Sequence, residues 1–217
     1  MIDIPVYSLD GKQTESLQVD EALLGGELRP ALLKQAYVMY HANQRQGSAA
    51  TKGRDQVEGS TRKLYKQKGT GRARRGPVRT NIMRGGGVAH RKTPHSFRHD
   101  MPVKMRRLAT RNAVLAKAVD NEIKVVAGFN FDGPKTKRFA AVLEALKIDR
   151  TCLLVVGAND GHTVLSARNL PNVRIIRIDQ LNAYDLLSRR YLLVDKATLT
   201  GWLDSQKPVI PNVEEAA

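Results

Sequence analysis

The residues best suited to chemistry lie in one run, Arg62 to Gly76, in which seven of fifteen positions are Lys or Arg. Guanidinium groups bind phosphate through two parallel hydrogen bonds, and Lys ammonium groups add point charge. Gly69 and Gly71 let the backbone approach a phosphate closely, and the ring of Tyr65 can stack on an unpaired base. The run therefore indicates nucleic-acid binding without sequence specificity, and a solvated basic loop or a localisation signal is the alternative.

The charge around this run is segregated from the rest of the chain. Residues 45–111 hold 19 Lys and Arg against three Asp and Glu, whereas the other 150 residues hold 17 against 18. The same 67 residues contain nine of the 17 Gly and only 17 apolar side chains, too few to form a core against the entropy of ordering them. We expect a polyanion to order this basic segment, and nucleic acid is the first candidate.

Two further groups in the basic segment have alternative interpretations. The triplet Gly85-Gly86-Gly87 indicates a tight reversal or a close backbone contact, although a flexible linker has the same composition. The spacing of His90, His95 and His99 is compatible with a metal site. These residues lie among Lys and Arg with no Cys and no acidic ligand nearby except Asp100, and such a setting disfavours a divalent ion. No metal site is therefore predicted.

The candidates for catalysis have simpler structural explanations. Gly157 to Gly161 resemble a dinucleotide-binding turn, but a strand-to-helix connection with a capping Asn or Asp explains them better, and no G-x-x-x-x-G-K-[ST] loop occurs. Asp160, His162 and Ser166 are suitable types for hydrolysis, but the chain has no G-x-S-x-G nucleophile elbow. Cys152 opens an apolar run with nothing beside it to stabilise a thiolate, so we expect a buried small hydrophobe. No catalytic residue and no cofactor are predicted.

Two helices are expected to flank the basic segment. The first begins near Pro30 and ends before Gly47, and the second runs from Met105 to Glu122. Three- and four-residue spacing predicts the apolar stripes Leu32, Leu33, Ala36, Tyr37, Tyr40 and His41 in the first helix and Leu108, Ala109, Asn112, Leu115, Ala116 and Val119 in the second. The polar face of the second helix is predicted to comprise Lys104, Arg106, Arg107, Arg111 and Lys117. We expect this face to extend the phosphate-binding surface.

The rest of the chain alternates apolar runs with helical patterns. The predicted strands are residues 2–7, 16–19, 123–126, 152–156, 173–178 and 191–194, and the later helices are residues 136–146, 162–169, 181–187 and 197–203. Such alternation predicts a three-layer α/β fold, a mostly parallel sheet with helices on both faces, plus a long extended internal basic loop. We assign residues 1–44 and 105–203 to the globular domain, 45–104 to the RNA-binding loop and 204–217 to a flexible tail.

Sequence features also bear on the compartment. No apolar run reaches the ~18 residues of a membrane-spanning helix, and the start MIDIPVYSLDGK lacks the basic-then-apolar layout of a secretory signal. A single Cys excludes an internal disulfide. The basic segment has no amphipathic apolar face that would hold it on a membrane surface. We expect a cytoplasmic protein with no membrane partner and no small-molecule substrate.

A series of short strings occurs in a fixed order along the chain. They are Arg45-Gln46-Gly47, Thr51-Lys52-x-Arg54, Val57-x-Gly59-Ser60, Gln67-Lys68-Gly69-Thr70-Gly71-Arg72-Ala73-Arg74-x-Gly76, Gly85-Gly86-Gly87-Val88, Pro134-Lys135-Thr136-Lys137 and Ala167-Arg168-Asn169-Leu170. In order and spacing they resemble the bacterial large-subunit ribosomal protein L four family over about residues 30 to 200. The string Q-K-G-T-G-R-A-R is highly specific for that family.

The resemblance implies an α/β domain on the outer face of the large ribosomal subunit, with an internal loop threading between domains of the large-subunit (23S-type) rRNA. It implies early binding during subunit assembly, neighbouring large-subunit proteins as partners, and a loop tip in the wall of the nascent-polypeptide exit tunnel. Carried over by position, the tip residues are Lys66, Lys68, Thr70 and Arg72. The residues holding the flanking RNA are Arg54, Lys63, Arg74, Arg75, Arg79 and Arg84.

The basic segment and the resemblance together predict one set of RNA-binding residues. They are Arg45, Lys52, Arg54, Arg62, Lys63, Tyr65, Lys66, Lys68, Gly69, Gly71, Arg72, Arg74, Arg75, Arg79, Arg84, Arg91, Lys92, Arg106 and Arg107. The chain departs from the family at Leu64-Tyr65, where Pro-Trp is usual, and at His90, where Phe is usual. The alternative function is an α/β RNA-processing or RNA-modifying enzyme with a basic substrate-gripping arm, which requires a carboxylate cluster or a cofactor turn that the sequence does not clearly provide.

Overall fold

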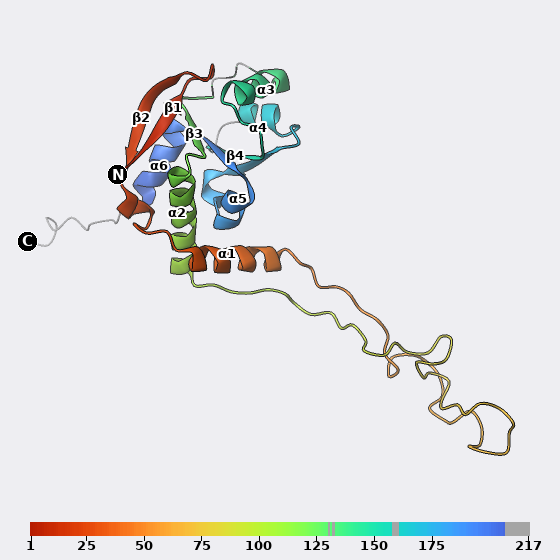
Figure 1. Cartoon of the computed structure of the whole chain (residues 1–217). Coiled ribbons are helices and arrows are strands. Elements are labelled where there is room, and N and C mark those ends of the chain that lie inside the picture. The colour runs from red at the N-terminus through yellow and green to blue at the C-terminus, as the bar shows by residue number, and fades with distance from the viewer. Residues whose placement is uncertain (130, 132, 158–160, 207–217) are drawn as a thin grey trace, which may run out of the picture. The chain divides into compact units, whose positions relative to one another are not determined.

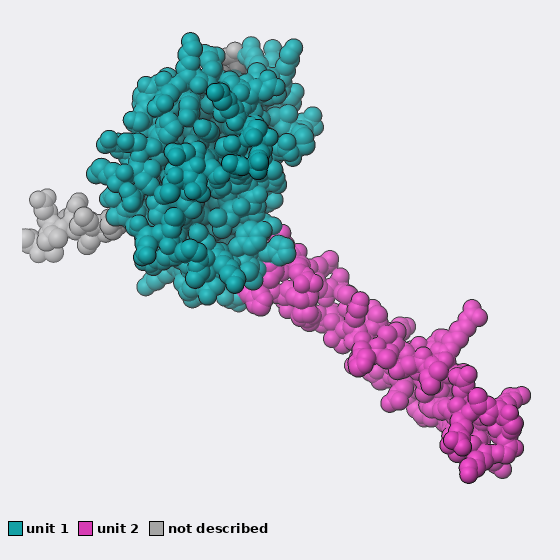
Figure 2. Space-filling model, viewed as in Figure 1, with its two compact units in different colours: residues 1–41, 100–217 teal, residues 42–99 magenta. Residues whose placement is uncertain are grey.

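The computed structural model describes residues 1–129, 131, 133–157 and 161–206. These residues form two compact units, shown in different colours in Figure 2. The first, here called the globular unit, comprises residues 1–41 and the described residues from 100 onward, and the second, here called the arm, comprises residues 42–99.

The globular unit is built on a six-stranded sheet (Figure 1). Its strands are β1 (Ile2–Tyr7), β2 (Gln13–Val19), β3 (Ile123–Val126), β4 (Cys152–Val156), β5 (Val173–Arg177) and β6 (Tyr191–Asp195), in the spatial order β2-β1-β3-β6-β4-β5. Only β2 is antiparallel to its neighbour β1, and the other described pairs are parallel. The sheet is therefore mostly parallel, as the sequence predicted.

Alternating side chains of the strands feed two separate cores. Leu153 and Val155 of β4 belong to one core, and Cys152, Leu154 and Val156 belong to the other. This alternation follows from the two-residue period of a strand, whose successive side chains point to opposite faces of the sheet. All five are at most 2% exposed, so β4 is buried from both sides.

Helices cover both faces. The helices are α1 (Pro30–Asn43), α2 (Val103–Val119), α3 (Thr136–Ala145), α4 (Gly161–Ala167), α5 (Ala183–Ser188) and α6 (Lys196–Gln206), with short 3-10 helices at Glu21–Leu24 and Ile178–Gln180. Residues of α1, α2, α5 and α6 pack into the first core, and residues of α3 and α4 pack into the second. This arrangement is the predicted three-layer α/β fold.

The ends of several elements differ from those predicted. The strand β2 begins at Gln13 instead of residue 16, and α2 begins two residues before Met105. The helix α6 continues to Gln206, so Asp204 to Gln206 are helical and not part of a tail. Residues 207–217, the remainder of the predicted tail, lie outside the described residues, as do residues 158–160 of the predicted dinucleotide-like turn.

The predicted apolar stripe of α1 is confirmed at Leu32, Leu33 and Ala36, which pack in the first core, but not at Tyr37 and His41. The buried residues are Ala36 and Met39, whereas Tyr37 is 36% exposed and His41 is exposed. The ring of Tyr37 lies 5.0 Å from the ring of Tyr184, so it packs on the outside of α5 and not in the core. The spacing of apolar residues predicted the helix, but it did not predict which residues at the margin of the stripe would be buried.

The predicted faces of α2 also need correction, at Lys117 and Val119. Lys117 was predicted on the polar face, but it is only 8% exposed, and Val119 of the predicted apolar stripe is 51% exposed. The Lys117 ammonium donates to Oε2 of Glu122 at 2.5 Å and to the carbonyl of Arg190 at 2.8 Å. Burial of this cation is tolerated because it is both paired and hydrogen-bonded.

Apart from Ala42 and Asn43, which end α1, the arm contains no helix and no strand, and all of its residues are described. Only Gly53 and Gly87 are buried in it, so no side chain of the arm is fully buried. In the part of the chain that the structure describes, no helix is both long and apolar enough to cross a membrane.

Candidate nucleic-acid interface

The arm concentrates positive charge on an exposed surface. Residues 42–99 contain 15 Lys and Arg against two acidic residues, Asp55 and Glu58. All of these cations are exposed except Arg75 and Arg79, which are half-buried. With so little apolar burial and so much charge, the arm has the physical properties of a polyanion-binding element.

The arm has two limbs, an outgoing limb that begins at residue 42 and a returning limb that ends at residue 99. Hydrogen bonds join these limbs at successive points. Asn43 exchanges two bonds with the backbone of His99, accepting from its N–H at 2.8 Å and donating to its carbonyl at 3.1 Å. The amide of His95 donates to the carbonyl of Gly47 at 3.2 Å, and the amide of Thr51 donates to the carbonyl of Lys92 at 3.0 Å. The limbs therefore run side by side, although residues on opposite limbs are about fifty positions apart in the sequence.

The glycine triplet lies where the returning limb touches the backbone of Gly53 and Arg54, a place called the backbone crossing from here on. Gly85 has φ +78°, in the left-handed region that favours glycine. A Cβ on Gly86 would lie 1.9 Å from the carbonyl oxygen of Thr80, and one on Gly87 would lie 2.3 Å from the amide nitrogen of Arg54. Both distances are far below a van der Waals contact, so the close-contact interpretation is confirmed over the flexible linker.

Two local hydrogen bonds close the base of the tip of the arm, residues 66–72. The amide of Leu64 donates to the carbonyl of Gly76 at 3.3 Å, and the Tyr65 hydroxyl donates to the carbonyl of Ala73. These bonds tie the two sides of the tip together at the position where the family usually has Pro-Trp. Gly69 and Gly71 have φ of +83° and +64°, with nothing within 4 Å of a Cβ on either.

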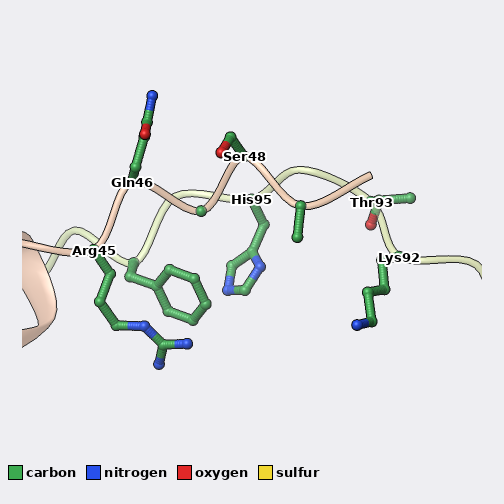
Figure 3. Close-up of a pocket in the computed structure, with 9 residues that line it drawn as sticks. Arg45, Gln46, Ser48, Lys92, Thr93 and His95 are labelled. Atoms are coloured by element: carbon green, nitrogen blue, oxygen red, sulfur yellow. The ribbon is translucent and has the colours of Figure 1, made fainter. Parts of the chain in front are cut away.

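A hollow of about 620 Å³ lies between the limbs near the start of the arm. The guanidinium carbon of Arg45 lies 3.9 Å from the centroid of the Phe97 ring, and the rings of His95 and Phe97 lie 4.0 Å apart at 56°. Figure 3 shows the side chains of Arg45, His95 and Lys92 pointing to one side of the limbs and Gln46 pointing to the other. Two cations thus flank an aromatic pair.

The predicted RNA-binding residues are distributed over both units. Arg106 and Arg107 lie near the start of α2 in the globular unit and are exposed, and the other seventeen lie in the arm. Besides Arg45 and Tyr65, four of the arm residues have side-chain contacts within the arm, and one of them is Lys63, whose ammonium donates to the side chain of Gln67. Arg91 pairs with Asp55, a guanidinium nitrogen of Arg79 lies 3.5 Å from the carbonyl of Val57, and one of Arg75 lies 3.7 Å from the sulfur of Met83.

The pKa of the acidic residue Asp55 is lowered in the arm. A hydrogen bond from its own backbone N–H, followed by the hydrogen bond from Arg91, holds the pKa of Asp55 below its usual value. Asp55 thus stays ionised within the basic arm and orients Arg91.

His90, at the second departure from the family, has φ +49°, a conformation that His adopts more readily than bulky or β-branched residues do.

Of the catalytic candidates in the globular unit, Ser166 and Cys152 are buried in the fold. Ser166 is fully buried, and its hydroxyl donates to the carbonyl of His162 at 2.7 Å and accepts from the amide of Lys135 at 3.0 Å. Asp160, the third member of the proposed hydrolytic set, lies outside the described residues. Burial raises the pKa of Cys152 to about 12, so the prediction of a buried, unreactive thiol is confirmed. Among the described residues, no group of three or more His, Cys, Asp or Glu is arranged to hold a metal ion.

The sequence matches the model of the family described as ribosomal protein L4/L1 over residues 17–203. The chain belongs to the ribosomal protein L4/L1 family. It is therefore a ribosomal protein, a component of the ribonucleoprotein of the large subunit that serves translation. Members of this family are structural and not enzymatic components of the ribosome, and their partners are rRNA and neighbouring ribosomal proteins. The match covers most of the globular unit and the entire arm, and it favours the ribosomal function over the RNA-processing enzyme.

The two residues of the hollow that carry rings, His95 and Phe97, were absent from the predicted RNA-binding set. His95 was considered only as a metal ligand, and Phe97 was given no role. The available signal was their spacing, because residues i and i+2 of an extended chain lie on the same side. Their proximity to Arg45, fifty positions earlier, carried no sequence signal.

Proposed function

We propose that the arm is the principal rRNA-binding element of this ribosomal protein. The observation that carries the proposal is the charge of residues 42–99, 15 cations against two acids, on a segment with no buried side chain. Packing of apolar side chains does not account for so many cations in one exposed segment, whereas neutralisation of RNA phosphates does. The exposed Arg106 and Arg107 on α2 extend the same function into the globular unit.

Salt dependence of rRNA affinity tests this proposal. If the arm neutralises about ten phosphates, the logarithm of affinity for protein-free large-subunit rRNA falls against the logarithm of salt concentration with a slope of roughly −7 to −9. The joint substitutions Arg54→Gln, Arg62→Gln and Arg74→Gln remove three exposed cations of the arm. They are expected to flatten the slope by about 2 to 3 units.

A matched control removes the same charge from the globular unit. Lys12, Lys147 and Arg150 are exposed there, and their joint replacement by Gln is expected to leave the slope within one unit of the unmodified protein. An equal flattening in both triple variants would contradict the assignment of binding to the arm, because it would report net charge alone.

We propose that the arm becomes ordered on RNA and that the protein binds early in subunit assembly, directly to rRNA. Bonds between limbs are few and exposed, and no side-chain core supports them, so they give little protection from water in the free protein. Hydrogen exchange of the RNA-free protein is expected to be fast from Arg54 to Arg84 and to slow on addition of large-subunit rRNA. Strong amide protection of this segment without RNA would refute the coupling of folding to binding.

We propose further that the tip residues Lys66, Lys68, Thr70 and Arg72 form part of the exit-tunnel wall. All four are exposed, and glycines in left-handed conformations separate the last three. A crosslinker on Thr70→Cys tests this placement, because Cys152 is fully buried with a raised pKa and stays unlabelled.

Ribosomes carrying a stalled nascent chain are the sample for that crosslink. We expect the Thr70→Cys variant to capture the nascent chain and a Ser60→Cys variant, exposed but before the tip, to capture rRNA instead. Equal capture of the nascent chain from both positions, or from neither, would overturn the tunnel placement while leaving rRNA binding intact. We propose a cytoplasmic ribosomal location and no catalytic, cofactor-dependent or membrane function.

A further inference from the structure

The hollow near the start of the arm has features that general phosphate binding does not require. It lies between two points where the limbs are joined, the bonds between Asn43 and His99 and the bonds between Thr51 and Lys92. A Cβ on Gly47 would lie 2.1 Å from the carbonyl oxygen of His95, so the limbs are also in contact partway along the hollow. Its volume of about 620 Å³ is within the ~300–1,000 Å³ typical of ligand sites.

The lining combines aromatic faces with cations and contains no acidic residue. Phe97 has the Arg45 guanidinium 3.9 Å from its centroid and the His95 ring 4.0 Å away. A guanidinium held over a ring keeps its edge N–H groups available for hydrogen bonds. Lys92 completes the row on the same side as Arg45 and His95 (Figure 3), and Ala49 and Ser48 are small enough to leave the space open.

We propose that this hollow binds one unpaired nucleotide of large-subunit rRNA, with its base on the open face of the exposed His95 ring, which packs on Phe97, and its adjoining phosphates on Arg45 and Lys92. The proposal rests on the proposed rRNA binding and names one nucleotide site within it. Base stacking on aromatic rings is the main means by which proteins hold unpaired RNA bases. The flanking cations match the phosphates on either side of such a base.

An unpaired nucleotide fits the hollow better than double-helical RNA. The bases of an A-form helix are stacked on one another, so their faces are closed to protein rings. The His95 side chain lies on one side of the limbs (Figure 3), where a single extruded base can reach its ring. The polar and cationic lining likewise disfavours an apolar side chain of a neighbouring protein as the occupant.

Ultraviolet crosslinking of the full protein to large-subunit rRNA, with mass spectrometry of the adducts, is the first test. The expected result is a single-nucleotide adduct on the peptide that contains His95 and Phe97. An adduct from a neighbouring ribosomal protein on this peptide in intact particles, or no adduct there while other arm peptides crosslink, overturns the nucleotide site. The second outcome leaves the general rRNA-binding function standing.

Affinity measurements with matched variants are the second test. Phe97→Leu is expected to weaken rRNA binding by about 5- to 150-fold with an unchanged salt slope, because it removes the ring that holds His95 in place for stacking and removes no charge. Phe97→Tyr is expected to retain binding. Gln46→Ala is the control from the same hollow, because Gln46 points to the opposite side of the limbs (Figure 3), and it is expected to bind like the unmodified protein.

An abasic residue at the crosslinked position of the rRNA provides a measurement that changes no protein residue. It is expected to weaken binding of the unmodified protein as much as Phe97→Leu does, and to cause no further loss in that variant. Fully additive losses, or a Phe97→Leu variant that binds like Gln46→Ala, would overturn the proposal. A steep salt slope in the same experiments shows that rRNA binding through the arm persists.

Discussion

Replacement of Gly87 by Ala tests whether the backbone crossing of the arm is part of the rRNA-bound structure. A Cβ at this position would lie 2.3 Å from the amide nitrogen of Arg54 and 2.5 Å from its Cα. Gly87 does not have a positive φ, so Ala adds no backbone strain of its own. The effect of the substitution is therefore steric and confined to the crossing.

The size of the effect follows from those distances. Non-bonded heavy atoms reach optimal separation at about 3.5 to 4.0 Å, so the two limbs would have to move apart by about 1 Å. Movement on this scale stretches the bond from the Val88 amide to the Lys52 carbonyl, now 2.9 Å, and the bond from the Gly87 amide to the Arg79 carbonyl, now 3.1 Å. Overpacking of this kind costs about 1 to 3 kcal/mol, which corresponds to about 5- to 150-fold in affinity.

The assay is equilibrium binding of the full protein to large-subunit rRNA at several salt concentrations. Gly76→Ala is the control, because a Cβ there would meet only the methyl group of Thr80 at 3.4 Å and Gly76 has no positive φ. Gly87→Ala should weaken binding by the stated factor with the salt slope unchanged, and Gly76→Ala should bind like the unmodified protein. Equal affinities for the two variants would show that the crossing is absent from the complex and refute the reasoning.

Three further predictions concern the globular unit and are checked by urea denaturation. Phe139→Ala should lower the free energy of unfolding by about 3 to 5 kcal/mol, because Phe139 is 0% exposed and its removal leaves a cavity; a loss below about 1 kcal/mol would contradict its place in the core. Asn112→Ala should cost about 2 to 4 kcal/mol, since the fully buried side chain accepts from the Arg29 amide at 2.7 Å and donates to the Glu27 carbonyl at 2.6 Å. Asn112→Asp, which keeps only the acceptor, should not restore stability. Because the folded Cys152 thiol has a pKa of about 12 and the unfolded thiol ionises near pH 8.5, its contribution is fully present below that pH and is lost as pH rises toward 12. Cys152→Ala should therefore remove up to about 1.4 kcal/mol per pH unit of the decline above pH 9, and identical slopes with and without the thiol would refute this.

Local patterns in the sequence were sufficient to predict most of the globular unit. Short apolar runs predicted β1, β3 and β4 with their observed bounds, and the alternation with helices predicted a mostly parallel sheet covered on both faces. The segregated charge of the basic segment identified the arm, because composition alone decides whether a segment can bury a core. Cys152 was predicted to be buried from its place in an apolar run, and it is.

The positions that sequence reasoning misjudged depend on partners far away in the chain. Lys117 looks like a surface residue of α2, but Arg190, 73 positions later, supplies the carbonyl that makes its burial possible. Tyr37 matches the apolar stripe of α1, but Tyr184 of α5 covers it from outside the core. The spacing of residues along a helix predicts which of them share a face. It does not predict which other part of the chain packs on that face.

The sequence by itself determined that this protein is an α/β domain with a basic, coreless internal segment, because periodicity, apolar runs and net charge are properties of neighbouring residues. Only the tertiary structure decided where the two limbs of that segment touch. It places Gly87 on Arg54 and brings Arg45 together with His95 and Phe97 around one hollow. The physical reason is that these contacts join residues 33 to 52 positions apart, and their geometry depends on how the chain returns along itself, which no local pattern records.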